Sequence, residues 1–110
     1  MDLDRAETDG AVVLSPRGRL NLTSASRLKQ AVDDEVGKGK ARLVLDLAEL
    51  EFIDSSGLGA IVSGLKAARQ AGGDLRIAAA GEQVLTVLKL TNLDRILRPH
   101  PSVEDATGGW

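Results

Sequence analysis

Residues 42–59 read RLVLDLAELEFIDSSGLG, and they predict a buried strand followed by the start of a helix. The run 42–47 is short and almost continuously apolar, which is typical of a strand covered on both faces. After the connecting residues 48–52, the sequence DSSG at 54–57 begins a helix whose apolar positions recur every three or four residues. This helix is expected to end at Gly72-Gly73.

A hairpin is predicted on the N-terminal side of this strand. The Asp-Gly pair at 9–10 is favoured in tight turns and lies between the segment 3–7 and the apolar run 11–14. We therefore expect two antiparallel strands at the start of the chain. Pro16 and Gly18 weaken any continuation of the second strand.

An amphipathic helix follows the hairpin. Apolar side chains at a spacing of three or four residues predict a helix that ends near 37–39. Asn21, Thr23 and Ser24 precede it, and any of these short polar side chains can cap its first turn.

The C-terminal half continues the alternation of strands and helices. The apolar patterns predict a strand at 75–78, a helix at 82–90 and a last strand at 96–97. Ser102 is placed to start a short helix, which then frays through Gly108-Gly109.

The predicted fold is a single α/β domain over residues 1–110. Strands that alternate with helices favour right-handed crossovers and a mostly parallel sheet. We expect a mixed sheet with an antiparallel opening hairpin, covered by about four helices. The ends, 1–8 and 107–110, are expected to be frayed.

The composition argues against several classes of function. Lys and Arg number 14 against 16 Asp and Glu, so no strongly basic field is available to hold a nucleic acid. The chain has no cysteine and a single histidine, which disfavours a metal centre. We expect no cofactor, no membrane segment and a cytoplasmic location, because no stretch of about 18 apolar residues occurs.

The start of the second helix carries the most informative chemistry. The first backbone N–H groups of a helix have no partner within it, so this end favours negative charge. One interpretation is purely structural: Asp54 or Ser55 caps the helix. The other is that Ser55 accepts a phosphate, which adds roughly −1.5 to −2 charge and alters the surface without unfolding the domain.

The segment 46–59, with Gly72-Gly73 and the apolar strand after it, resembles the STAS-domain anti-sigma factor antagonists, also called anti-anti-sigma factors. The resemblance covers nearly the whole chain. It implies that the free protein binds an anti-sigma factor that is also a serine kinase, and so releases a bacterial sigma factor for transcription. The kinase then phosphorylates the antagonist, and a serine phosphatase restores it.

The resemblance also implies particular functional residues. The phosphoacceptor of the family is the first Ser after the Asp, which is Ser55 here. The implied partner-binding surface consists of Asn21, Thr23, Asp54, Ser55, Ser56, Gly57 and Leu58. Asn21 departs from the family's pattern, because a Gly-x-Leu/Ile-Asp stretch often ends at this position with a carboxylate.

Two other uses of these residues are disfavoured. A hydrolytic role for Ser55 needs a nearby base, and the only histidine, His100, lies between prolines that favour a loop. Glu49, Glu51 and Asp54 are acidic residues in a connecting loop, where such groups are usually solvated and bind no metal. We therefore predict a binding module and not an enzyme.

A second class of function stays open at this stage. The resemblance extends to STAS-like domains that serve as regulatory parts of anion transporters and of lipid-transport complexes. The absence of a membrane segment argues against a covalently attached transporter. It leaves open a separate soluble STAS subunit of a transport or lipid-trafficking complex.

Overall fold

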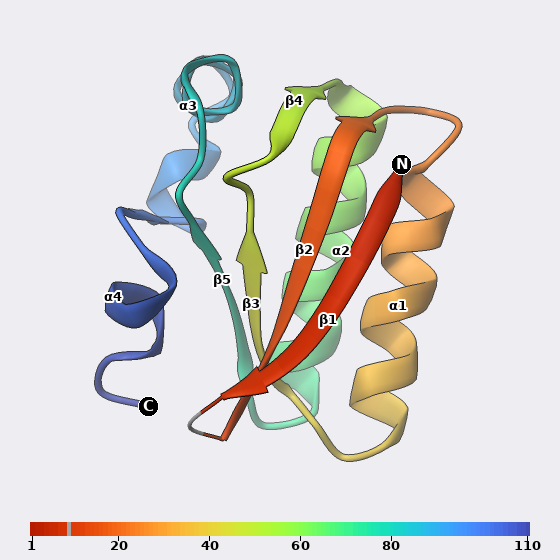
Figure 1. The fold of residues 1–110 in the computed structure, drawn as a ribbon, viewed down its shortest axis with the longest axis vertical. Coiled ribbons are helices and arrows are strands. Elements are labelled where there is room, and N and C mark those ends of the chain that lie inside the picture. The colour runs from red at the N-terminus through yellow and green to blue at the C-terminus, as the bar shows by residue number, and fades with distance from the viewer. Residues whose placement is uncertain (9) are drawn as a thin grey trace.

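The computed structural model describes residues 1–8 and 10–110, and Figure 1 shows the arrangement of the elements. Within those residues the chain forms, in order, β1 (Asp2–Thr8), β2 (Ala11–Leu20), α1 (Ala25–Gly37), β3 (Arg42–Asp46), β4 (Leu50–Ile53), α2 (Ser55–Gln70), β5 (Asp74–Ala78), α3 (Glu82–Leu90), the 3-10 helix η1 (Leu93–Arg95), β6 (Pro99–His100) and α4 (Val103–Thr107).

The strands form one mixed sheet, as predicted. Its order is β1-β2-β3-β5-β6, and β4 pairs with the far end of β2. Only β1 and β2 run antiparallel, whereas every other pairing in the described residues is parallel. The predicted mostly parallel α/β fold with an antiparallel opening hairpin is therefore confirmed.

The opening hairpin turns where its sequence predicts. Thr8 and Ala11 face each other across the turn, and Gly10 has a φ of 79°, a conformation that glycine adopts at little cost. Asp9, the other residue of the predicted turn, lies outside the described residues.

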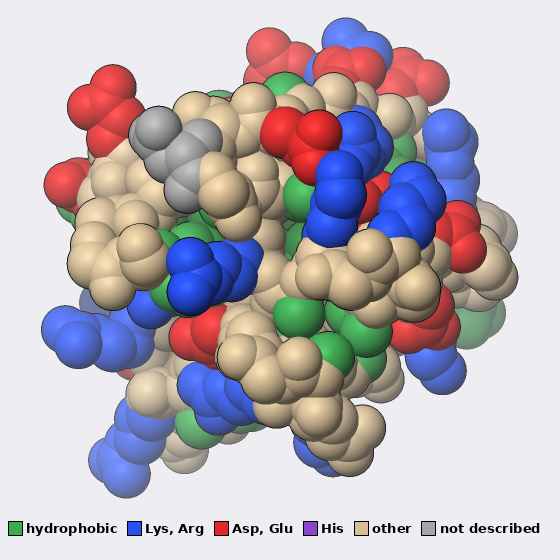
Figure 2. Space-filling model, turned by 90° about the horizontal axis from the view of Figure 1, so that it is seen from below, with side chains coloured by type: hydrophobic (Ala, Val, Ile, Leu, Met, Phe, Trp, Pro, Cys, Tyr) green, Lys and Arg blue, Asp and Glu red, His purple; other side chains and the backbone are tan. Residues whose placement is uncertain are grey.

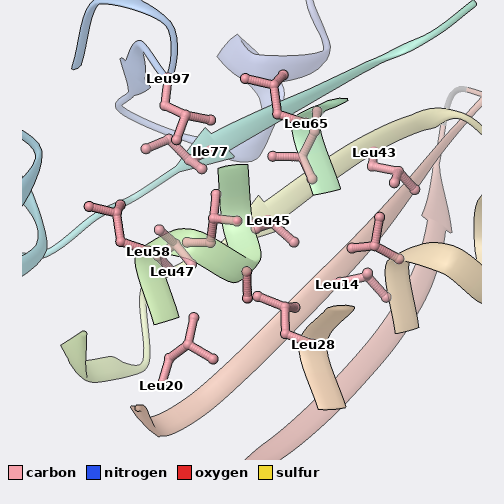
Figure 3. Packing of buried hydrophobic residues seen from close by; sticks show 14 of the residues in the cluster. Leu14, Leu20, Leu28, Leu43, Leu45, Leu47, Leu58, Leu65, Ile77 and Leu97 are labelled. Atoms are coloured by element: carbon pink, nitrogen blue, oxygen red, sulfur yellow. The ribbon is translucent and has the colours of Figure 1, made fainter. Parts of the chain in front are cut away.

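The central strand is buried on both faces, because helices cover both sides of the sheet. In Figure 1, α2 lies behind the strands and α1 beside them on the right, whereas α4 lies on the left and packs on the opposite face of the sheet. Leu43 and Leu45 join the larger cluster, whereas Val44 contacts the smaller one with Ala106 of α4. The larger cluster is aliphatic and rich in leucine, as Figure 3 shows.

The sheet contains one strand that the sequence did not predict, and another strand is longer than predicted. Residues 48–52 were predicted to connect strand and helix, but Leu50–Ile53 forms β4. The second strand does not weaken at Pro16 and Gly18 but runs to Leu20. Pro16 is tolerated because it lies between the part of β2 that pairs with β3 and the part that pairs with β4, and the register shifts after Gly18.

The predicted C-terminal strand is displaced along the chain. The pair at 96–97 does not form a strand, because the amides of Ile96 and Leu97 both donate to the carbonyl of Leu93 in the turn that ends η1. Pro99 and His100, predicted as loop, form β6 beside β5 instead. Pro99 can occupy this place because β6 is the last strand of the sheet, so one side of it needs no ladder partner.

The outer surface is of mixed charge. Seen from below, acidic and basic side chains alternate over much of the molecule, with small hydrophobic patches between them (Figure 2). None of the helices formed by residues 1–8 and 10–110 combines the length and the apolar character that crossing a bilayer requires.

A buried carboxylate ties the edge strand to the first helix. Glu35 of α1 accepts two hydrogen bonds of 2.9 Å from the guanidinium of Arg5 in β1. Only 5% of its side chain is exposed, and Lys38 lies 3.7 Å away as a second cation. The hydrogen bonds from Arg5, aided by the positive charges, hold the pKa of Glu35 below its ordinary value despite burial.

Glu35→Gln is expected to lower the free energy of unfolding by about 1–3 kcal/mol at neutral pH, because the charged hydrogen bonds with Arg5 are lost. Since folding lowers the pKa of Glu35, this stabilisation is present above the ordinary pKa of 4.5 and is lost as the pH falls through the lowered value. Urea unfolding across the acid range measures the difference between the two proteins. Lys38→Gln is the control, and an equal loss in that variant would contradict the role of Arg5.

Candidate functional site

Asp54 joins the two loops that carry the predicted site residues. Its carboxylate accepts a hydrogen bond from the amide of Gly57 at 2.9 Å, which caps α2, and another from the amide of Leu22 at 3.2 Å. Its own amide donates to the carbonyl of Leu20 at 3.2 Å. One residue thus connects the end of β2, the loop before α1 and the first turn of α2, and the predicted capping by Asp54 is confirmed.

Gly57 allows this close approach of helix and strand. A Cβ at this position would overlap the backbone carbonyl of Leu20 and would lie 2.8 Å from the Leu20 Cγ. Any side chain would push the start of α2 away from the end of β2. The absence of a side chain at Gly57 therefore sets the distance between the start of α2 and the end of β2.

Ser55 and Ser56 occupy the first two positions of α2. Ser55 is exposed, and Ser56 is partly buried. Their backbone amides donate no hydrogen bond to any described part of the chain. Added negative charge on Ser55 would therefore lie beside two unpaired donors at the positive end of the helix dipole.

The loop before α1 is ordered by its own polar side chains. Asn21 Oδ1 accepts hydrogen bonds from the amide of Thr23 at 3.1 Å and from its hydroxyl at 2.7 Å. Ser24 is the N-cap residue of α1, but its side chain makes no capping hydrogen bond. It donates instead to the carbonyl of Arg19 at 2.9 Å. Of the three predicted caps, Ser24 therefore does not act as one, whereas Asn21 caps the turn that leads into α1 by accepting from the amide of Thr23.

The predicted partner-binding residues do not all reach the surface. Thr23 and Ser55 are exposed, whereas Asn21, Asp54 and Ser56 are partly exposed. Gly57 and Leu58 are buried, and Leu58 is only 4% exposed. Both lie in the first turn of α2, where they pack beneath the exposed residues and are largely shielded from solvent.

An apolar hollow that the sequence analysis did not predict lies beside Ser55. It has a volume of about 530 Å³ between α2 and α3. Its lining includes Ser55, Leu58, Val62, Val87 and Leu93. The helical spacing of these residues was visible in the sequence, but only the packing of α3 against β4 and η1 shows that their side chains share one hollow.

Two further residues of this region were also missed. Leu22 is 77% exposed, a large apolar side chain on the loop that Asp54 holds in place. Gln83 of α3 accepts a hydrogen bond from the amide of Ile53 and donates one to its carbonyl, both at 2.9 Å. These bonds hold the backbone immediately before Asp54, and no local sequence signal marks Gln83 for this role.

The three acidic residues at 49, 51 and 54 lie in the turn before β4, on β4 and at the N-cap of α2. Glu49, Glu51 and Asp54 do not converge, and the described part of the chain contains no cluster of three or more potential metal-ligating side chains. The arrangement offers exposed hydroxyl and amide groups beside an apolar hollow, which suits recognition of another protein.

The comparison with protein families agrees with this architecture. The STAS domain model matches residues 2–106. The chain belongs to the STAS domain family. This confirms the family predicted from the segment around Asp54.

Several similar proteins carry names from one regulatory system. A protein of Thermotoga maritima, named as a candidate anti-sigma factor antagonist, is 39% identical over 99 residues, which span 89% of this chain and 88% of that protein. The anti-sigma-F factor antagonist RsfB of Mycobacterium tuberculosis is 28% identical over 106 residues, with 94% and 84% covered. A crystal structure of a Thermotoga maritima protein named in the same way superimposes with a TM-score of 0.88 at 37% identity, and covers 94% of this chain and 90% of the other.

Gly57→Ala is expected to lower the free energy of unfolding by about 1–3 kcal/mol, because the new methyl group overlaps the carbonyl of Leu20. Gly59→Ala is the matched control in the same helix, since a Cβ there meets no atom within 4 Å. The control is expected to raise stability by up to about 1 kcal/mol through helix propensity. Urea unfolding measures both, and equal effects of the two variants would contradict the proposed close contact.

Proposed function

We propose that this STAS domain is an anti-sigma factor antagonist whose binding to an anti-sigma factor is switched off by phosphorylation of Ser55. The partner is an anti-sigma factor with serine kinase activity, and binding it releases a sigma factor. A serine phosphatase returns the antagonist to its binding form. The observation that carries the proposal is the exposed hydroxyl of Ser55 at the start of α2, on a surface that Asp54 holds rigid.

The names of the relatives support the class of partner. The Mycobacterium tuberculosis relative is named for antagonism of anti-sigma-F factor, and the match spans 94% of this chain. The match also covers 84% of that protein's own length. The surface around Ser55 is therefore the natural candidate for the same type of partner.

The geometry supports a switch that acts on binding and leaves the fold intact. Ser55 is exposed at the edge of the apolar hollow, so a phosphate can be added without disturbing the packing below. The two unpaired amides at the helix start favour the new charge, whereas the carboxylate of Asp54 opposes it. These effects partly cancel within the domain.

The phosphate instead lowers the affinity of the domain for its partner. A partner that covers Ser55 would have to desolvate a group of roughly −1.5 to −2 charge. A penalty of about 4 kcal/mol is sufficient to weaken binding about a thousandfold. Exposed Leu22 and the apolar hollow beside Ser55 provide the buried contact area in the unphosphorylated complex.

Asn21 and Thr23 contribute a neutral rim to this surface. The Thr23 hydroxyl donates to Asn21 Oδ1 at 2.7 Å, so both side chains present neutral polar groups. We infer that the partner meets a hydrogen-bonding group here and not a charge. Ser56 lies next to the acceptor, with Gly57 and Leu58 supporting both from below.

A pull-down from a lysate of the source bacterium, using wild type, Ser55→Ala and Ser55→Asp, tests the proposal. Wild type and Ser55→Ala are expected to retain an anti-sigma factor, whereas Ser55→Asp is expected to lose most of it because of the added charge. Gln70→Asp is the charge control, since Gln70 is exposed at the opposite end of α2 from Ser55. Mass spectrometry identifies the bound protein.

The captured kinase and ATP then test the acceptor directly. One phosphate is expected on wild type and on Ser56→Ala, and none on Ser55→Ala. Phosphate on Ser55→Ala would show that another residue is the acceptor. Recovery of a membrane transport complex without any anti-sigma factor would replace the proposal by a transport-subunit function.

A further inference from the structure

A basic hollow lies at the outer edge of the sheet, lined by residues that the surface around Ser55 does not use. It has a volume of about 350 Å³ and is bordered by β5, by the segment around η1, by the end of α2 and by Gly108. Its charged lining consists of Arg69, Asp74, Arg76, Arg95 and Arg98, with His100 beside them. Four arginines thus surround one carboxylate in a chain whose net charge is −2.

The hollow exists because β6 is short. Only Ile77 and Ala78 of β5 pair with β6, so the earlier residues of β5 have no strand neighbour on that side. On that side the amide of Leu75 donates a hydrogen bond of 2.9 Å to the carboxylate of Asp74 and not to a neighbouring strand. A polar recess therefore takes the place that a longer strand would fill.

Asp74 shows how this recess holds an oxyanion. Its carboxylate accepts the hydrogen bond from the amide of Leu75 and another from Arg69 Nε at 3.1 Å, and Arg76 Nε lies 3.6 Å away. Arg76 is itself fixed, because its guanidinium lies 4.0 Å from the ring centroid of Trp110 and donates to the carbonyl of Ala106 at 2.8 Å. One carboxylate is thus held by one amide and two guanidinium groups.

Two arginines of the hollow are not engaged in this arrangement. Arg95 and Arg98 are exposed and form no ion pair with any acidic group in the described residues. They lie three positions apart on the segment that leads into β6, and both line the hollow.

We propose that this hollow binds a small phosphate-bearing anion through Arg95 and Arg98, beside the carboxylate of Asp74. The planar guanidinium groups match the oxygens of a phosphate, and a dianion gains more from two cations than a monovalent ion does. The site is open to water, so its affinity is modest and decreases with salt. It is a second ligand site, independent of the proposed function at Ser55.

NMR titration of the whole chain with inorganic phosphate, and separately with glycerol phosphate, tests the site. Amide shifts are expected at Leu75, Arg95 and Arg98 and not around Ser55. Tighter binding of the monoester would identify a phosphorylated metabolite as the class of ligand, and tighter binding of inorganic phosphate would identify the free ion.

Three variants separate a built site from general charge attraction. Arg95→Gln combined with Arg98→Gln is expected to weaken binding about tenfold. Asp74→Asn retains an acceptor for the amide of Leu75 but removes the competing charge, and is expected to tighten binding about threefold. Lys29→Gln, an exposed cation on α1, is the charge control and is expected to change binding by less than about twofold.

The proposal is overturned if neither anion shifts the amides of the hollow. It is also overturned if Lys29→Gln weakens binding as much as the double arginine variant does, because the attraction would then follow net charge alone. Unfolding by urea confirms that the arginine variants remain folded, so a loss of binding reports on the site itself.

Discussion

The carboxylate of Asp54 is the constraint on which the candidate surface depends. It accepts hydrogen bonds from the amides of Leu22 and Gly57, so the loop before α1 and the start of α2 are held by the same side chain. The arrangement works because Gly57 lets the helix approach the carbonyl of Leu20. Together the two residues fix the position of Ser55 relative to the ends of β2 and β4. The surface that they hold in place is called the platform below.

The platform is supported from a third side by α3. Gln83 bonds to both backbone groups of Ile53 and thereby completes the outer edge of β4 with a side-chain amide. The same helix forms one wall of the apolar hollow beside Ser55. A rigid polar rim and an apolar recess thus lie next to each other, a combination that favours recognition of a protein partner.

The two proposed sites use charge in different ways. At Ser55 the surface carries few charges before modification, so one phosphate changes its character and affects a partner more than the fold. At the edge of β5 the arginines are always charged, and the carboxylate of Asp74 neutralises part of their positive charge through its contacts with Arg69 and Arg76. The first arrangement suits a switch, and the second suits reversible binding of a small anion.

The sequence by itself determined the elements with strong periodicity: the hairpin, the buried central strand, α2 with a cap at Asp54 or Ser55, and α3. Local spacing and capping chemistry are sufficient for these. Only the tertiary structure decided that Leu50–Ile53 is a strand, that β2 passes through Pro16, and that Gln83 supports Ile53. Each of these depends on a partner about 30 residues away in the sequence, and a contact between distant segments leaves no periodic signal in either of them.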